Sequence, residues 1–375
     1  MARRPTSKNT KTPDQISARL KALRQRLKAD AVDALLVVNP VDIFYLTGFV
    51  GHDSWAIVPT RGRGEWIISD SRFDEQIKRE APHARVVMRK GRLVEALKEL
   101  LSSGSIETLA VQQDYLTVGQ FQAVGKALGK RRIKAYDDGL LEQRAIKQPE
   151  EVRAIAKAGR IQQQAFNELR EMLKPGQHEA ELAAFLEYRV RALGADGVSF
   201  PTIVAADANA ALPHAIPGRR KLKAGSSVLI DWGARFGGYC SDMTRVVALG
   251  KMKPKVREIY QIVLDAQLAA IDAIKPGVRQ VDVDRVARDV IDQAGYGEQF
   301  GHGLGHGLGL DIHEAPRLSP LAGDGVLQPG HVVTVEPGIY LPGQGGVRIE
   351  DDVLVTERGH RVLTDLPKTL ESAII

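Results

Sequence analysis

The sequence predicts two domains: an α/β domain over residues 14–147, then a domain over 148–375 built from a duplicated helix–helix–hairpin unit. Short apolar runs alternate with helical patterns in the first part, and a Lys-Pro-Gly segment recurs in the second. We place the boundary near AIKQPEE (145–151), where Pro149 and the glutamates after it are typical of a helix start.

The composition indicates a globular protein. The chain has 375 residues and is 43% hydrophobic, which is enough to form two cores. No stretch approaches about 18 consecutive apolar residues, so no membrane association is expected. The segment MARRPTSKNTKTPDQ lacks the apolar centre of a secretory signal, and the single Cys240 favours a reducing, cytoplasmic location.

The net charge of +6 is concentrated near the N-terminus. Residues 1–30 hold nine Lys/Arg and two Asp, so the rest of the chain is almost neutral and no nucleic-acid partner is expected. Apolar residues at helical spacing follow in the same segment: Ile16, Leu20, Leu23 and Leu27. The basic residues are therefore interpreted as the solvated face of a helix, with a functional basic arm as the alternative.

In the first domain, five short apolar runs predict strands at 34–38, 56–58, 66–68, 85–88 and 109–111. Helical patterns lie near 71–81, 92–102 and 117–129. No phosphate-binding glycine fingerprint follows any of these strands, so a nucleotide site is not expected.

The second domain contains a weak internal repeat. Residues 174–200 (KPGQHEAELAAFLEYRVRALGADGVSF) resemble residues 275–300 (KPGVRQVDVDRVARDVIDQAGYGEQF). Each copy follows a long amphipathic helix, opens a second helix that ends near glycine, and precedes histidines and a pair of strands. We interpret this as a duplication, and chance similarity of two capped helices is the alternative.

Each half of the repeat has a hairpin that carries two acidic residues. A turn between Phe236 and Gly237 puts Asp231 opposite Asp242, and a turn centred on Gly343 puts Glu336 opposite Glu350. Opposed carboxylates repel each other, and two such pairs at matching places indicate bound cations. Two divalent ions would offset the four charges, and oxygen ligands with an imidazole suit manganese, iron, cobalt or zinc.

The run GHGLGHGLGLDIHE (301–314) supplies candidate imidazole ligands. It holds His302, His306 and His313, and the spacing alone leaves open which of them binds metal. The glycines disfavour a helix and suit a strand or loop where backbone must approach other groups closely. His214, in ALPHAIPG, follows the first repeat and taken alone is an ordinary loop residue.

Four motifs together resemble the pita-bread metallopeptidases: HGLGHGLGLDIHE (302–314), IDWGARFGGYCSDMTR (230–245), VEPGIY (335–340) and RIEDD (348–352). That family includes methionine aminopeptidase, aminopeptidase P, prolidase and creatinase. The α/β domain at the N-terminus is similar to the one in aminopeptidase P, prolidase and creatinase, so the resemblance implies the Xaa-Pro peptidase branch. It also implies an α+β pita-bread catalytic domain with a pseudo-twofold repeat.

The resemblance implies a role for each site residue. The metal ligands would be Asp231, Asp242, His306, Glu336 and Glu350, with Asp242 and Glu350 bridging two ions. His214 and His313 match residues that contact the substrate carbonyl or the tetrahedral intermediate. His302 and Arg348 match residues beside the substrate. Glu336 is the expected acceptor of the proton from the attacking water, and the two histidines can donate hydrogen bonds.

These features predict an enzyme that uses two divalent ions to cleave the amide bond between an N-terminal residue and proline. Mn²⁺ is favoured over Co²⁺, Zn²⁺ and Fe²⁺, the substrates would be proline-containing peptides, and a homodimer is expected. One alternative is hydrolysis of a non-peptide C–N bond on the same scaffold. The other is a catalytically silent peptide-binding protein, which the complete ligand set argues against.

Overall fold

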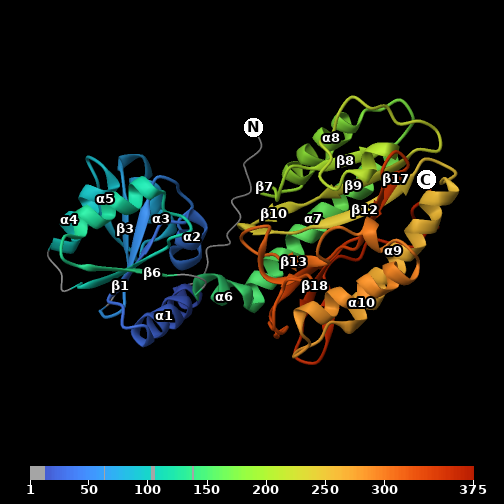
Figure 1. Ribbon diagram of the computed structural model, residues 1–375. Coiled ribbons are helices and arrows are strands. Elements are labelled where there is room, and N and C mark those ends of the chain that lie inside the picture. Colours follow the sequence, from blue (N-terminus) through green and yellow to red (C-terminus); the bar gives the residue numbers. More distant parts are fainter. Residues whose placement is uncertain (1–12, 63, 103–105, 137–138) are drawn as a thin grey trace. The chain divides into compact units, whose positions relative to one another are not determined.

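The computed structural model describes residues 13–62, 64–102, 106–136 and 139–375 (Figure 1). The basic residues of segment 1–12 lie outside these ranges. The chain divides into two compact units, residues 1–143 and 144–375. In the described part of the chain, no helix has the length and apolar character needed to cross a membrane.

Unit 1 is built on one mixed sheet with the order β4-β3-β2-β1-β5-β6. Its strands are β1 (Ala34–Val37), β2 (Trp55–Pro59), β3 (Trp66–Ser69), β4 (Arg85–Met88), β5 (Thr108–Val111) and β6 (Arg132–Ala135). Its helices are α1 (Pro13–Ala29), α2 (Pro40–Thr47), η1 (Ser71–Phe73), α3 (Asp74–Glu80), α4 (Leu93–Ser102), α5 (Val118–Leu128) and α6 (Gly139–Ala145), the last of which runs to Ala145 in unit 2.

The five predicted strands of unit 1 all form, and the alternating pattern indeed produces an α/β layer. Helices α4 and α5 pack on one face of the sheet, where their apolar side chains share a core with those of β1, β2, β3 and β5. The sequence prediction missed β6, because RIKA is mostly exposed at the sheet edge and has no apolar run.

Helix α1 buries the predicted apolar stripe, since Ile16, Leu20, Leu23 and Leu27 are all at most 4% exposed. Its basic side chains do not form a simple solvated face. Arg19 is buried and donates to the carbonyl of Tyr45 at 3.0 Å, while Arg24 donates to Pro59 at 3.1 Å. Arg19 and Arg24 thus bind carbonyls within unit 1, whereas Lys21 and Lys28 are exposed, so the predicted solvated face is present over only part of the helix.

Unit 2 contains two helix pairs, each packed on strands. The helices are α7 (Pro149–Met172), α8 (Glu179–Ala192), α9 (Pro254–Ala273) and α10 (Gln280–Gln293), with short η2 (Asp207–Ala211) and η3 (Gly297–Gln299). The strands of the first half are β7 (Gly197–Val198), β8 (Ile203–Ala206), β9 (Ser227–Trp232), β10 (Ala234–Phe236), β11 (Tyr239–Cys240) and β12 (Met243–Ala248).

The second half contributes a five-stranded sheet and a hairpin. The sheet has the order β14-β13-β15-β18-β19, and β16 pairs with β17. These strands are β13 (Gly305–Gly307), β14 (Glu314–Leu318), β15 (Val332–Val335), β16 (Gly338–Leu341), β17 (Gly345–Arg348), β18 (Asp351–Val355) and β19 (His360–Val362).

The duplication predicted from the sequence is visible in matching helix pairs and matching hydrogen bonds. Pro149 opens α7, and α8 and α10 each follow a Lys-Pro-Gly turn. The N–H of Gly176 donates to Leu222, and the N–H of Gly277 donates to Leu327, both at 2.8 Å. Alternate residues of β8, β9 and β12 face α7 and α8 on one side and α9 on the other, as expected for a strand period of two.

The second hairpin has the predicted register, but the first does not. Both ladders of the second hairpin, β15 with β18 and β16 with β17, are centred on Gly343 and place Glu336 across from Glu350. In the first hairpin Asp231 pairs with Thr244 rather than Asp242. The turn there lies at Gly237–Gly238, whose positive φ angles of 59° and 83° form a tight hairpin turn and shift the register by two residues.

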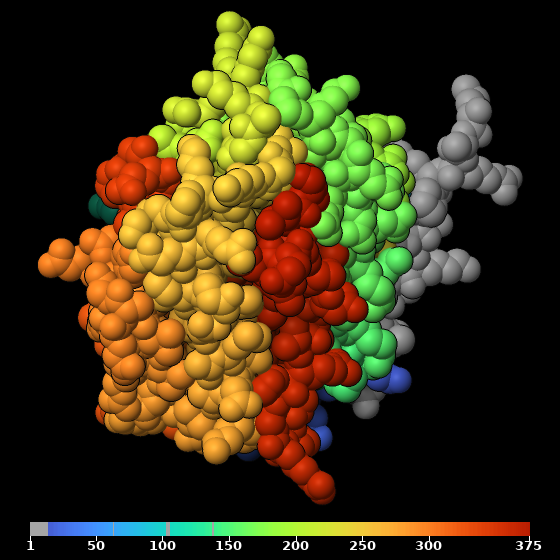
Figure 2. Space-filling model, turned by 90° about the vertical axis from the view of Figure 1, so that its right-hand side faces the viewer, coloured from blue at the N-terminus to red at the C-terminus, as the bar shows by residue number. Residues whose placement is uncertain are grey.

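The C-terminal segment after β19 runs along the surface between α9 and α7 (Figure 2, red between gold and green). Tyr260 of α9 donates to the carbonyl of Lys368 at 3.0 Å, and Arg170 of α7 donates to that of Ser372 at 2.6 Å. The backbone N–H of Ile375 reaches Ala248 of β12 at 3.0 Å. The segment therefore ties both helix pairs to the central strands.

The first turn offers a test of the register. Gly237→Val should lower the free energy of unfolding of unit 2 by about 1–2 kcal/mol, because a β-branched residue strongly disfavours φ near 59°. Gly237→Asn is the matched control, since asparagine tolerates this conformation. Urea unfolding, followed through amide exchange of β9 and β12, measures both; equal losses in the two variants would contradict the turn assignment.

Candidate metal centre

Five acidic or imidazole side chains meet where the two halves of unit 2 join. Asp231 is the second-last residue of β9, and Asp242 directly precedes β12. His306 is the middle residue of β13, Glu336 directly follows β15, and Glu350 directly precedes β18. Strands or the residues next to them therefore supply every one of the ligands that the family resemblance implies.

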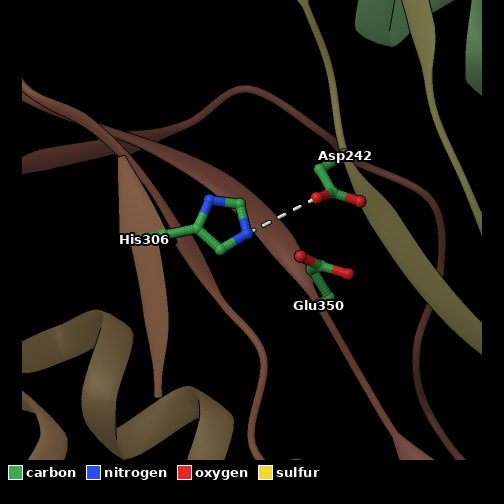
Figure 3. A group of neighbouring side chains, drawn as sticks. All are labelled: Asp242, His306 and Glu350. Carbon is green, nitrogen blue, oxygen red and sulfur yellow. Dashed lines mark ion pairs between the residues drawn. The ribbon is translucent and has the colours of Figure 1, made fainter. Parts of the chain in front are cut away.

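Three of these side chains point toward one another (Figure 3). One ligand atom each from Asp242, His306 and Glu350 lies within 4.8 Å of the others. His306 Nε2 is 3.7 Å from Asp242 Oδ2 and 3.3 Å from Glu336 Oε1. The group thus has the mixed nitrogen and oxygen donors that suit a divalent cation.

The orientation of the His306 ring leaves one nitrogen for a ligand. Nδ1 lies 3.0 Å from the carbonyl of Gly307, and an N–H there donates to it. Nε2 then carries the free lone pair and faces the carboxylates. Burial lowers the pKa of His306, so the neutral imidazole needed for metal binding is favoured.

The carboxylates repel one another because they are buried together. The pKa of Asp242 is well above its ordinary value because of burial and the nearby charges of Glu350, Asp231 and Glu336. The pKa of Glu350 is raised well above its ordinary value by burial, then by Glu336 and Asp231. Without a cation, such a cluster lowers its charge by binding protons.

The same carboxylates have oxygen atoms without protein partners. Asp231 Oδ1, Asp242 Oδ1 and Glu350 Oε1 are buried, and no described group donates to them. Buried polar atoms are nearly always hydrogen-bonded or metal-bound. Three such oxygens on three of the five expected ligands fit a site built for cations.

Arg348 fixes the Asp231 carboxylate through a buried ion pair. It is 3% exposed, and Nη2 lies 2.5 Å from Asp231 Oδ2. Its other nitrogens donate to the Thr244 hydroxyl at 3.0 Å and to the Tyr340 hydroxyl at 2.8 Å. All three side-chain nitrogens are thus engaged with protein, and the predicted contact of Arg348 with substrate remains a prediction.

Thr244 and Tyr340 are site residues that the sequence analysis missed. Thr244 donates to Glu350 Oε2 at 2.7 Å and lies opposite Asp231 in the ladder, so it links the two hairpins. The Tyr340 hydroxyl lies 2.9 Å from His302 Nε2. The correct register of the first hairpin would have placed Thr244 opposite Asp231, and the alternation of β16, whose register was predicted correctly, could have revealed Tyr340.

The other three histidines of the predicted site, His302, His313 and His214, differ in their surroundings. Both ring nitrogens of His302 are engaged, one with Tyr340 and one with the carbonyl of Gly303 at 2.8 Å. The His313 ring meets the His306 ring edge to face, with centroids 4.4 Å apart. His214 is exposed. The pKa of His313 is lowered by burial and by the charges of His306 and His214.

The glycines of the histidine run permit close backbone approach, as predicted. A Cβ on Gly305 would lie 2.1 Å from the carbonyl oxygen of Thr334, and one on Gly307 would lie 2.1 Å from that of Ala315. Only glycine therefore lets β13 pass between its two neighbouring strands while presenting His306.

A buried ion cluster fixes the segment that carries His313. Glu314 is 7% exposed and binds Arg144 and Lys147, the latter at 3.0 Å, and it also accepts from the N–H of Asp311 at 3.0 Å. Arg144 also binds Asp311 at 2.7 Å. Two cations on one carboxylate next to His313 orient the backbone there.

Comparison with known proteins shows the family to which the chain is related. The sequence model of the metallopeptidase family M24 matches residues 153–357, and that of the creatinase/prolidase N-terminal domain matches residues 19–146. The Xaa-Pro dipeptidase of Pyrococcus furiosus is 36% identical over 94% of this chain and 99% of that protein.

The chain is also similar in structure to solved Xaa-Pro peptidases. The Xaa-Pro dipeptidase from Bacillus anthracis superposes with a TM-score of 0.91 at 36% identity, covering 96% of this chain and 100% of its own. The X-Pro aminopeptidase from Thermotoga maritima has a TM-score of 0.86 at 37% identity, covering 93% and 100%.

The Glu314 cluster predicts a pH-dependent stability. Burial opposes ionisation of Glu314, but Lys147, Arg144 and the Asp311 N–H together lower its pKa to about 2. Its contribution is therefore complete above the ordinary value of 4.5 and is lost as the pH falls toward 2.

Glu314→Gln should reduce the free energy of unfolding by about 3–5 kcal/mol at pH 7, because it removes the buried negative charge that Arg144 and Lys147 share. Asp311→Asn, at a more exposed partner of Arg144, should cost at most about 1 kcal/mol. Denaturant unfolding at pH 7 and pH 3 measures both. A Glu314→Gln loss that is the same at both pH values would contradict the assignment.

Proposed function

The chain belongs to metallopeptidase family M24, and on that premise we propose that it cleaves the bond between an amino-terminal residue and proline. The observation that carries the proposal is the group of buried, mutually repelling carboxylates around His306 whose unpaired oxygens fit cations. Relatives named Xaa-Pro dipeptidase, similar over almost the whole chain, support the substrate class.

Asp231, Asp242, His306, Glu336 and Glu350 are the residues that would hold two divalent ions. We propose Mn²⁺ as the resident metal, because the hard oxygen donors outnumber the single imidazole. When bound, such ions activate water and polarise the substrate carbonyl.

Glu336 is the proposed acceptor of the proton of the attacking water. Its pKa is raised, with burial the largest cause, which brings it toward the range of a useful base. The Thr334 hydroxyl donates to Oε1 at 3.1 Å, and His306 lies beside the same oxygen, so the carboxylate is held in one orientation.

His313 and His214 are the proposed hydrogen-bond donors to the developing oxyanion and the leaving nitrogen. His313 contacts His306 edge to face, so it borders the ligand group directly. His214 lies in an exposed loop, where it can meet a substrate that enters from solvent.

His302, Tyr340 and Arg348 form a connected group that we propose as one wall of the proline pocket. A prolyl nitrogen has no hydrogen to donate, and its ring fixes φ near −65°, so such a site must recognise ring shape. The chain from Arg348 through Tyr340 to His302 holds the imidazole in place for that purpose.

The homodimer and the cytoplasmic location are also proposals. The first rests on the family resemblance, and the second on the single cysteine, Cys240, which is buried. Sedimentation velocity of the purified chain tests the first, with a monomer at micromolar concentration as the contradicting result.

Metal content is the first test of the function. The purified protein should bind about two divalent ions per chain, and chelation should abolish peptidase activity that Mn²⁺ or Co²⁺ then restores. Asp242→Ala should lose both metal and activity. His214→Ala should keep its metal while kcat falls by about 10²–10⁴-fold, the usual scale for a lost acid–base partner.

Elemental analysis and peptide hydrolysis measure these properties together. Full activity in metal-free protein would refute the metal requirement. Loss of metal in His214→Ala would instead refute the choice of His306 as the imidazole ligand.

Substrate choice is the second test. We expect cleavage of Xaa-Pro and Xaa-Pro-Xaa peptides with a free amino terminus, and little action on Xaa-Ala-Xaa or N-acetylated peptides. Rates across this panel, measured with the Mn²⁺-loaded enzyme, decide the specificity. Equal rates on proline and alanine peptides would refute the proline pocket and leave the metal chemistry intact, whereas no peptide cleavage would favour a non-peptide C–N bond as the target.

A further inference from the structure

Glu179, the first residue of α8, is a buried carboxylate far along the chain from any proposed ligand. It is 0% exposed, and within the described part of the chain its oxygens accept hydrogen bonds only from the loop of residues 206–218. The N–H of Ala206 donates to Oε1 at 2.7 Å and that of Gly218 to Oε2 at 3.2 Å. The amide of Asn209 donates to both oxygens, at 2.9 and 3.1 Å.

Burying a carboxylate is costly unless its charge is offset. Among the described side chains, none forms an ion pair with Glu179. The N–H groups of the loop therefore offset the charge of its carboxylate. Charge-assisted hydrogen bonds are about twice as strong as neutral ones. The hydrogen bonds from the carboxylate to both ends of segment 206–218 are therefore stronger than hydrogen bonds between neutral groups in a loop.

That segment is the one that carries His214. It leaves β8 at Ala206, passes through η2, and returns to α8 at Gly218, whose carbonyl accepts from the N–H of Ala180 at 3.1 Å. His214 lies between the anchors at Asn209 and Gly218 and is exposed. Beside it, the carbonyl of Pro213 accepts a long hydrogen bond of 3.4 Å from Arg348.

We propose that Glu179 is a positioning residue: by clamping the two ends of segment 206–218, it holds His214 at the distance from the metal centre that catalysis requires. The inference rests on the proposed role of His214. The hydrogen bonds of the Glu179 carboxylate in the described residues go to the loop and not to the proposed ligands, so its effect would reach the reaction through the loop.

Glu181 is a matched control on the same helix turn. It is exposed, and its carboxylate caps the helix by accepting the N–H of His178 at 2.8 Å. Glu179→Gln and Glu181→Gln both remove one negative charge from the start of α8. Only the first change places an amide NH₂ against N–H donors of the loop.

The test is a double-mutant cycle between Glu179→Gln and His214→Ala, with the Mn²⁺-loaded enzyme and an Xaa-Pro peptide. In the presence of His214, Glu179→Gln should lower kcat by about 10- to 100-fold, because a displacement near 1 Å has such an effect. With alanine at 214 it should have no further effect, and metal content should be unchanged throughout. Glu181→Gln should keep the parent kcat.

The outcomes distinguish a failure of the positioning role of Glu179 from a failure of the proposed role of His214. If His214→Ala slows turnover and Glu179→Gln slows both backgrounds equally, Glu179 has only a structural role and the inference is overturned. If His214→Ala has the parent kcat, the proposed role of His214 fails first, and the clamp has nothing to position.

A second measurement and a second variant keep the test possible if Glu179→Gln folds poorly. Amide exchange in segment 206–218 should become faster in Glu179→Gln and remain unchanged in Glu181→Gln. Asn209→Ala removes one donor and keeps the carboxylate, so the same cycle can be run with it if Glu179→Gln does not fold. Unchanged exchange in the folded variant, or additive effects of Asn209→Ala and His214→Ala, would refute the clamp.

Discussion

Repulsion among buried carboxylates is the constraint on which the rest of unit 2 depends. Asp231, Asp242, Glu336 and Glu350 lie close enough that burial and their neighbours' charges push the pKa values of Asp242 and Glu350 far upward. A fold can maintain such a cluster only if surrounding groups hold each carboxylate in place until a cation binds. Thr244 and the Arg348 guanidinium supply that support on the protein side.

The duplicated architecture places these carboxylates at or next to the ends of strands and supports them with surrounding elements. Each hairpin is backed by a helix pair, and the C-terminal segment closes over the junction. Its Lys368 binds Asp351 at 2.6 Å, and Arg245 binds the same carboxylate at 2.7 Å while donating to the carbonyl of Glu350. The backbone of an expected bridging ligand is thus fixed by ion pairs that involve the last residues of the chain.

The three histidines proposed to act on the substrate share one structural feature. Each lies on a segment tied by a buried acid: Glu179 holds the loop of His214, and Glu314 follows His313. For His302, Asp284 accepts the N–H of Leu304 and pairs with Arg288, which donates to the carbonyl of His302 at 2.8 Å. In all three cases hydrogen bonds to a buried carboxylate or its ion-pair partner fix the backbone near the histidine.

The sequence by itself determined the two-part organisation, the repeat and the pairing of Glu336 with Glu350, because periodicity and turn glycines are local properties of the chain. It did not determine the register of β9 with β12. Two turns one residue apart are possible there, and the packing of the strands decides between them. The structure has the turn at Gly237–Gly238. Nor could spacing decide which histidine faces the carboxylates. Only the tertiary structure brings His306 to Asp242 and Glu350, engages Arg348 with Asp231, and sets Glu179 beneath the loop of His214. These contacts join residues up to more than a hundred positions apart, and no local pattern encodes them.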